Sequence, residues 1–319
     1  MNEESLIKQI KTPQEFIELH FPHQDSAPQC IECNTFKYNT GEGFLEIFTL
    51  DDLQAFPNHF FGSQTRKKFY TMVLITQGKM EEVIGHQHYV FEENQMYFIA
   101  ENQLHLIERW SKDLKGVMCL FDSDYFLLCL KHQIKLNSFP FFQVGHQPYL
   151  KLSERETEMM EHLFWKLQSE KVQKKTFNDD LLVRMFLNII LLEAERIYNY
   201  QSLQLPFVLS RKEQLVAKFQ LLVNQKVIDV KQVSDFALLL HVHPHYLNDV
   251  VKEVTGVSAS GYIHKVLIEE AKSRLIQTNH TVSQIAMELN FTEESYFGRF
   301  FKKNTGVTPL QYRKTHKQH

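Results

Sequence analysis

The chain has 319 residues, 43% of them hydrophobic and 23% charged, with a formal net charge of −3 at pH 7. Such a composition supports a packed core and excludes a disordered, collagen-like or disulfide-stapled chain. The sequence starts with an acidic segment, holds four cysteines and has no run of about 18 apolar residues. We therefore expect a reduced, cytoplasmic protein without a membrane-spanning helix.

Charge divides the chain into two parts. Residues 211–319 hold 15 Lys and Arg against 10 Asp and Glu, whereas the first 210 residues hold 20 against 28. A mildly basic module attached to an acidic body indicates that the C-terminal third binds a polyanion.

The first 125 residues have the pattern of a β-rich domain. Residues 1–35 predict an amphipathic helix followed by irregular chain. After them come short segments rich in aromatic and β-branched residues, with Gly85 placed as a hairpin turn. These segments are 69–75, 82–91, 95–100, 104–110 and 116–121. Strands at this spacing predict a small antiparallel barrel or sandwich.

The pattern then changes to helical spacing. Ser153 and Glu156 form a capping-box pair at the start of a helix that extends to about Lys171. A second helix, from about Asn178 to Tyr198, is apolar over most of its circumference and is therefore expected to be buried. Burial against the barrel and burial in a homodimer interface are both open, and we favour a homodimer interface, alone or shared with the barrel.

The C-terminal third is helical in pattern throughout. Residues 201–209, which include Pro206, predict the interdomain linker, and Ser210 with Glu213 forms a second capping box. The predicted helices lie near 210–225, 231–240, 244–254, 258–278, 281–289, 293–304 and 309–316.

This third contains an internal repeat. Val233–Ser258 is similar to Val282–Thr308, with an offset of 49 in the front half and 50 in the back half. Each copy predicts helix, turn and helix, with Ala237 or Ala286 where two helices would cross closely. Two copies in the basic part of the chain favour tandem helix-turn-helix units over a generic helical hairpin.

The helix between the two copies has a length suited to DNA. Its roughly 20 residues rise about 30 Å, and one turn of B-DNA is about 34 Å. Two reading helices held at that separation would enter successive major grooves on one face of a duplex.

The second copy carries a more specific motif. Residues from about Ile228 to His316 resemble the DNA-binding domain of the AraC/XylS family of bacterial transcription regulators. The resemblance rests on Ser283–Ala286, Leu289–Phe291, Ser295–Phe297, Phe300–Lys302, Gly306–Pro309 and Tyr312–Arg313. Asn290 stands where the family usually has Gly, and because Asn tolerates a left-handed turn, we expect no change of fold.

The resemblance implies an α+β protein. A cupin-like antiparallel β-barrel with helices would sense an effector and dimerise, and an all-α domain with two helix-turn-helix units joined by a long helix would bind promoter DNA. The expected boundaries are residues 1–149 for the sensor, 150–200 for a helical dimerisation segment, 201–209 for the linker and 210–319 for the DNA-binding domain. The implied activator would meet double-stranded DNA, a second copy, a small-molecule effector and RNA polymerase, with no cofactor and no catalysis.

The family pattern also implies which residues meet DNA. The expected base readers are His245, Asn248 and Asp249 in the first reading helix and Ser295, Tyr296 and Arg299 in the second. Asn pairs with adenine, Asp accepts from cytosine, and Arg bridges guanine O6 and N7. The expected phosphate contacts are Lys252, Lys302 and Lys303. The alternative for Arg299 is a surface arginine paired with Glu294 or a phosphate, and for Asp249 a salt bridge to Lys252 or a neighbouring cation. For the three lysines the alternative is a solvated charged face.

Two further patterns are reminiscent of metal sites. His86, His88 and Glu92, with His105 as a fourth ligand, resemble the metal set of cupin enzymes. Because this segment follows Gly85 at a hairpin, where exposed histidines are common, we expect no bound metal. Cys30 and Cys33 form a CxxC pair without two further zinc ligands or a thioredoxin context, so incidental thiols are expected.

Aromatic strands offer an effector pocket inside the barrel. The expected lining is Tyr70, Met72, Phe91, Tyr97 and His105. Half of the strand side chains point outward, and alternation does not decide which half, so core packing without a ligand is the alternative. Two other functions stay open: a metal-dependent cupin enzyme with an appended DNA-binding module, and a ligand-independent regulator controlled by a protein partner.

Overall fold

The computed structural model describes residues 7–21, 43–56, 61–85, 87–126, 136–173, 177–202 and 210–316. The chain divides into two compact units, the first made of Met1–Leu128 and Phe139–Phe207 and the second of Cys129–Ser138 and Val208–His319. All ten described strands belong to the first unit, and the described part of the second is helical, so the predicted α+β class is confirmed. Most of the predicted linker, residues 203–209, lies outside the described residues.

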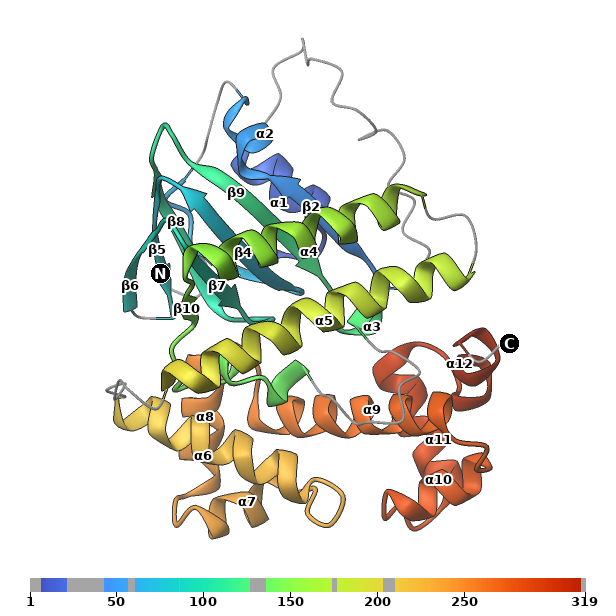
Figure 1. The fold of residues 1–319 in the computed structure, drawn as a ribbon. Helices are drawn as coiled ribbons and strands as arrows, with labels where there is room; N and C mark the ends of the chain where they lie inside the picture. Colours follow the sequence, from blue (N-terminus) through green and yellow to red (C-terminus); the bar gives the residue numbers. More distant parts are fainter. Residues whose placement is uncertain are drawn as a thin grey trace. The chain divides into compact units, whose positions relative to one another are not determined.

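The first unit contains two five-stranded sheets (Figure 1). One sheet has the order β1 (Lys8–Ile10), β3 (Thr65–Lys67), β8 (Leu104–Trp110), β5 (Lys79–Ile84) and β6 (Gln87–Glu92). The other has the order β10 (Tyr149–Lys151), β7 (Gln95–Ile99), β4 (Tyr70–Gln77), β9 (Lys115–Phe121) and β2 (Leu45–Thr49). Neighbours are antiparallel except β1 and β3, which are parallel.

The five predicted strand segments correspond to β4 through β9, with the turn at Gly85 in a left-handed conformation (φ 65°). The sequence pattern missed β1, which lies inside the predicted N-terminal helix, because three residues are too few for an alternation to be recognised. The helix itself is shorter, α1 (Pro13–His20), and its N-terminus is capped by Thr12, which accepts from the backbone N–H of Glu15.

The core lies between the two sheets. Alternate residues of each strand point inward, and the inner positions are largely aliphatic and aromatic. The buried cluster includes Val73, Ile75, Phe91, Tyr97 and Met118, and α1 adds Phe16.

Two long helices, α4 (Glu154–Gln173) and α5 (Phe177–Ser202), lie side by side next to the second sheet (Figure 1). The predicted capping box at α4 is present: Glu156 N–H donates to Ser153 Oγ, and Ser153 N–H donates to Glu156 Oε2 over 2.8 Å. The shorter helices of this unit are α2 (Leu50–Gln54), α3 (Ser123–Phe126) and the 3₁₀ turn η4 (Pro140–Phe142).

A single chain buries one face of α5 and leaves the opposite face exposed. Its inner face, including Val183, Leu187 and Ile190, is fully buried. Its opposite face carries four large apolar side chains that are 37–41% exposed: Leu182, Met185, Ile189 and Leu192. The helix therefore has two apolar faces, and the rest of the chain covers only one of them.

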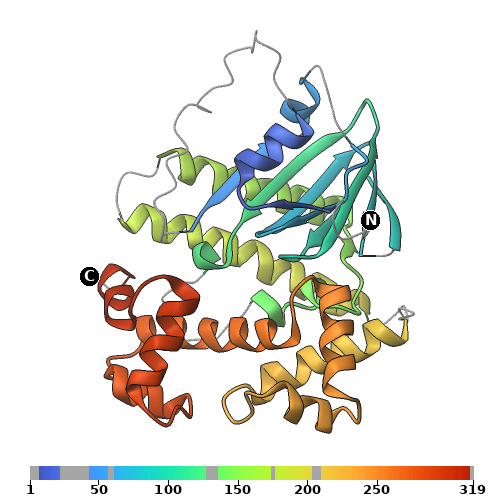
Figure 2. The ribbon, with the colours of Figure 1, turned by 180° about the vertical axis from the view of Figure 1, so that it is seen from behind.

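The second unit contains all seven predicted helices (Figure 2). They are α6 (Arg211–Lys226), α7 (Val233–Leu239), α8 (Pro244–Thr255), α9 (Ala259–Gln277), α10 (Val282–Glu288), α11 (Glu294–Thr305) and α12 (Pro309–His316), preceded in sequence by the 3₁₀ turn η3 (Leu136–Ser138). Figure 2 shows α9 running between one group of helices, α6 to α8, and another, α10 to α12. None of the helices in the described part of the chain is long and apolar enough to cross a membrane.

Candidate nucleic-acid interface

The internal repeat folds as two helix-turn-helix units of equal dimensions. The first helices, α7 and α10, have 7 residues each, and the second helices, α8 and α11, have 12 each. Both second helices end at a left-handed glycine, Gly256 (φ 75°) and Gly306 (φ 82°), which closes the helix without a Cβ clash. The helix α9 between the units has 19 residues and a rise of roughly 28 Å.

Both turns pass through a left-handed residue that is not glycine. His241 (φ 55°) and Asn290 (φ 53°) occupy equivalent positions of the two copies. The predicted left-handed role of Asn290 is thus confirmed, and the turn keeps its shape with Asn in place of Gly.

Each second helix buries one face and exposes the other. Leu247 and Val251 of α8 and Phe297 and Phe301 of α11 are buried in the unit. Five of the six predicted base readers are exposed on the opposite face: His245, Asp249, Ser295, Tyr296 and Arg299. Tyr246, which the sequence analysis passed over, is the repeat equivalent of Tyr296 and is similarly exposed.

Asn248 departs from the prediction. It is half-buried, and its Oδ1 accepts a hydrogen bond from the backbone N–H of Ala259 over 3.2 Å, at the start of α9. The equivalent residues in the second copy are Gly298 and Pro309, which have no side chain to accept and no N–H to donate. The matched loss of both partners indicates that Asn248 helps to join α8 to α9.

Two charged side chains of the exposed faces lack an ion pair. Among the described residues, the side chains of Arg299 and Asp249 make no ion pair, so the alternative surface pairs with Glu294 and Lys252 do not form. Lys252, Lys302 and Lys303 are exposed toward the C-terminal ends of α8 and α11. These positions suit phosphate contact, because a cation there also compensates the helix dipole.

The two faces differ in charge. The position of Lys303 in the second copy is occupied by Glu253 in the first, and Glu253 is held by Lys212 of α6 through two 2.7 Å contacts. Arg299 likewise has Asp249 as its counterpart. The second reading helix is therefore the more cationic of the two.

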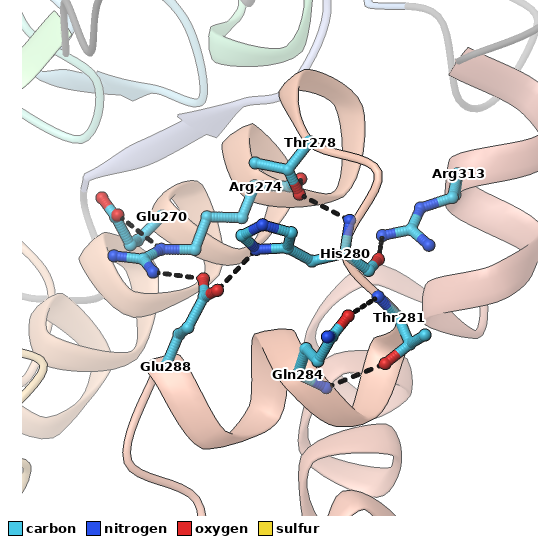
Figure 3. A network of polar contacts seen from close by, with 8 residues as sticks. All are labelled: Glu270, Arg274, Thr278, His280, Thr281, Gln284, Glu288 and Arg313. Carbon is cyan, nitrogen blue, oxygen red and sulfur yellow. Dashed lines mark hydrogen bonds and ion pairs between the residues drawn. The ribbon is translucent and has the colours of Figure 1, made fainter.

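A polar network connects the second helix-turn-helix unit, α10–α11, to α9 (Figure 3). Arg274 donates to Glu270 Oε1 over 2.9 Å and to Glu288 Oε2 over 2.7 Å. His280 Nδ1 lies 2.5 Å from Glu288 Oε1, and Arg313 donates to the backbone oxygen of His280 over 2.6 Å. Glu270 is buried, so its carboxylate depends on Arg274 for compensation.

The predicted effector-pocket residues do not share one site. Phe91, Tyr97 and His105 are buried between the sheets. Tyr70, in contrast, contacts Phe121 and Phe142, and Met72 has the same strand parity, so both lie on the helix-covered face of the second sheet. Strand alternation separates the two groups, and the sequence could not assign the faces.

A buried polar cluster between the sheets joins Tyr97 and His105 to Glu82, which was not among the predicted residues. Glu82 Oε1 accepts from the Tyr97 hydroxyl over 2.9 Å, and Glu82 Oε2 lies 2.9 Å from His105 Nε2. Lys67, also buried, donates to Thr71 Oγ1 over 3.3 Å. Glu82 lies on the same side of β5 as Met80 and Ile84, and this apolar alternation is the sequence signal that could have predicted its burial.

Burial shifts the titration of this cluster. It lowers the pKa of the Lys67 ammonium from 10.5 to about 8, against the attraction of Glu82. Burial, followed by the charge of Lys67, also lowers the pKa of His105, although Glu82 opposes the shift. Burial and then Glu82 raise the pKa of Tyr97 well above 10. No described residue forms a hydrogen bond with His105 Nδ1.

The cupin-like metal set does not assemble from its described members. His88 and Glu92 lie on the exposed side of β6, where His88 pairs with Glu108 and Glu92 with Lys79, whereas His105 is buried between the sheets. His86, Cys30 and Cys33 lie outside the described residues. Ligand atoms of Glu81, His88 and Glu108 lie within 4.8 Å of one another, a set that could hold a cation, but Glu81 also pairs with Arg109.

Comparisons with known proteins agree with this architecture. Residues 236–315 match the family model of a helix-turn-helix domain, and residues 53–186 match that of an AraC-like ligand binding domain.

Individual relatives match about a third of the chain. The chain is 29% identical over 114 residues to the uncharacterized HTH-type transcriptional regulator YisR of Bacillus subtilis (strain 168), covering 36% of this chain and 39% of that protein. It is 37% identical over 93 residues to YobQ of the same organism, an uncharacterized regulator of the same type, covering 29% and 39%. The C-terminal domain of AraT, a response regulator from Geobacillus stearothermophilus, is a solved structure with 30% identity and a TM-score of 0.31, covering 33% of this chain and 88% of that one.

Proposed function

The chain belongs to the AraC family of transcription regulators, and from this premise we propose that it binds promoter DNA in a sequence-specific manner and is controlled through its N-terminal domain. The chain spans 39% of the length of the first two relatives, so the activity of the whole protein is proposed from its own residues.

The exposed faces of α8 and α11 carry the proposal. Two equal helices, each with one buried and one exposed face, are joined by a helix whose rise is close to one turn of DNA. His245 and Asp249 would read one half-site, and Ser295, Tyr296 and Arg299 the other. Lys252, Lys302 and Lys303 would neutralise phosphates and set the affinity.

Selection from randomised duplex DNA by the full-length protein at near-physiological salt tests the proposal. Two short motifs about one helical turn apart are the expected result. Weak binding that falls steeply with salt and yields no motif would reject sequence-specific reading.

The interior of the first unit is the proposed effector site. Phe91, Tyr97 and His105, together with Lys67 and Glu82, combine aromatic surface with buried polar groups, as ligand sites commonly do. The buried ammonium and the unpaired His105 Nδ1 favour a small ligand with hydrogen-bonding oxygens. Control by a protein partner, without a ligand, is the second candidate and predicts that no small molecule changes DNA binding.

The exposed stripe of α5 is the proposed dimer interface. Leu182, Met185, Ile189 and Leu192 are spaced by three, four and three residues, the a/d pattern of a helix pair. An isologous contact between two such stripes would cover side chains that one chain leaves in water. A homodimer of this kind would bring two pairs of reading helices to one promoter, where RNA polymerase is a further proposed partner, in the cytoplasm.

Binding is favoured over catalysis because the described ligands of the cupin-like metal set lie on opposite sides of a sheet. A metal-dependent enzyme would need His88, Glu92 and His105 to converge on one ion.

A further inference from the structure

The loop between α6 and α7 reaches across to the turn of the second helix-turn-helix unit. Lys231 Nζ donates to the backbone oxygen of Ile228, over 3.0 Å, and to that of Asn290, over 2.9 Å. The same ammonium lies over the ring of Phe291, 5.2 Å from its centroid. Lys231 therefore bridges its own loop and the α10–α11 turn.

The side chain of Asn290 makes the reciprocal contacts with the α6–α7 loop. Its Nδ2 donates to the backbone oxygen of Ile228 over 3.4 Å and to Asp229 Oδ1 over 3.3 Å. A glycine would provide the left-handed turn equally well but neither of these bonds. Asn at this position thus combines a turn conformation with a contact to the other half of the domain.

These contacts connect the two reading units without passing through α9. The loop belongs to the α6–α8 group, in which Phe219 of α6 packs on Phe236 of α7. The turn belongs to the α10–α12 group and immediately precedes α11. A single helix leaves two bundles free to bend and twist relative to each other, whereas a second point of attachment removes that freedom.

We propose that the contact of Lys231 and Asp229 with the Asn290–Phe291 turn is a clamp that fixes the spacing and angle of α8 relative to α11. The inference rests on the proposed DNA reading, because its consequence is selection for one separation between the two half-sites. The clamp residues act through the reading helices and need not touch a base themselves.

A reversal of donor and acceptor tests the clamp in the full-length protein. Asn290→Asp keeps a residue that tolerates the left-handed turn, removes the donor and places a carboxylate beside Asp229. The double variant Asp229→Asn, Asn290→Asp restores one donor and one acceptor at the unchanged net charge of the pair. His241→Asp makes a charge change at the equivalent turn position, which does not contact the other half.

DNA selection and binding provide the first readout. Asn290→Asp is expected to accept half-sites at two or more separations and to lose about fivefold in affinity for the composite site, with little change for an isolated half-site. The double variant is expected to regain the single separation, and His241→Asp to keep it. Wild-type spacing in Asn290→Asp, or no recovery in the double variant, would overturn the clamp.

Hydrogen exchange without DNA separates the clamp from the reading function. The amides of Asp229 and Val230 are bonded to the Lys226 oxygen and should exchange faster in Asn290→Asp and recover in the double variant. Unchanged exchange rates of these amides in Asn290→Asp would overturn the clamp, whatever the result of the DNA-binding experiments. If the exchange rates change as expected but the wild-type protein selects no DNA motif, the contact is upheld and sequence-specific DNA reading is rejected. The contact would then have no role in setting the spacing of half-sites.

Discussion

The side chain of Asn248 and the backbone of Ala259 form a hydrogen bond of 3.2 Å between the first reading helix and the first turn of α9. The N–H groups of a first helical turn have no partner inside their own helix, so an outside acceptor stabilises the helix start. The bond gives Asn248 a role in stabilising the start of α9, at a position where the family pattern implies base reading.

Asn248→Ala is therefore expected to lower the free energy of unfolding of the second unit by about 1 kcal/mol and to leave the selected DNA motif unchanged. Chemical denaturation and DNA selection measure the two effects. The exposed neighbour His245→Ala should show the opposite pattern, with unchanged stability and an altered motif. A changed base preference without a loss of stability in Asn248→Ala would show that Asn248 reads a base.

Arg299→Ala should relax base preference in one half-site at a cost of about 1–3 kcal/mol, because an arginine bridging guanine O6 and N7 discriminates against other bases. Lys303→Ala, on the same helix, should weaken all sequences alike and reduce the salt slope by about 1. Binding isotherms for the consensus and its single-base variants, at several salt concentrations, distinguish the two. An unchanged motif and affinity in Arg299→Ala would reject the assignment.

Glu288→Ala should destabilise the second unit by about 1–3 kcal/mol, since it removes hydrogen bonds from both Arg274 and His280. Glu288→Gln keeps a neutral acceptor and should fall between the wild type and the alanine variant. Thermal unfolding measures the series. Equal stability of all three proteins would show that the network in Figure 3 contributes nothing measurable.

The buried His105 predicts a dependence of stability on pH. Its pKa in the folded protein is below the ordinary 6.5, so between these two values the unfolded chain binds more protons. The contribution of His105 is therefore fully present above about pH 6.5 and is lost as the pH falls through 6.5 toward the folded pKa. Unfolding measured from pH 8 to 5 should show a smaller slope in His105→Gln, and an unchanged slope would contradict the argument. The exposed His88 provides the control, His88→Gln.

Ile189→Glu should convert a dimer to monomers, because it places a charge at the centre of the apolar stripe on α5. Trp165→Glu makes the same kind of change at an exposed position of another helix, α4, and should leave the assembly unchanged. Sedimentation velocity over a range of concentrations gives the masses. A wild-type protein that stays monomeric, or an Ile189→Glu variant that stays dimeric, would reject this interface.

Local signals in the sequence decided where many of the helices begin and end. The capping boxes at Ser153 and Ser210, the left-handed residue at Asn290 and the glycines that end α8 and α11 act within a few residues of themselves. Helical periodicity over 12 residues is likewise read without knowledge of the rest of the chain. For these reasons the seven helices of the second unit could be placed from the sequence.

Tertiary structure decided which partner each polar side chain meets. Asn248 finds its partner 11 residues away, and Lys231 finds Asn290 59 residues away. Tyr70 lies on β4 and Tyr97 on β7, so alternation within one strand cannot compare them, and only the packed sheets show that Tyr97 faces the interior and Tyr70 does not. Periodicity marks α5 as apolar over most of its circumference, whereas the fold decides which side the chain itself covers. Propensity and capping are encoded over one helical turn, while burial and long-range hydrogen bonds depend on every element that packs at the same place.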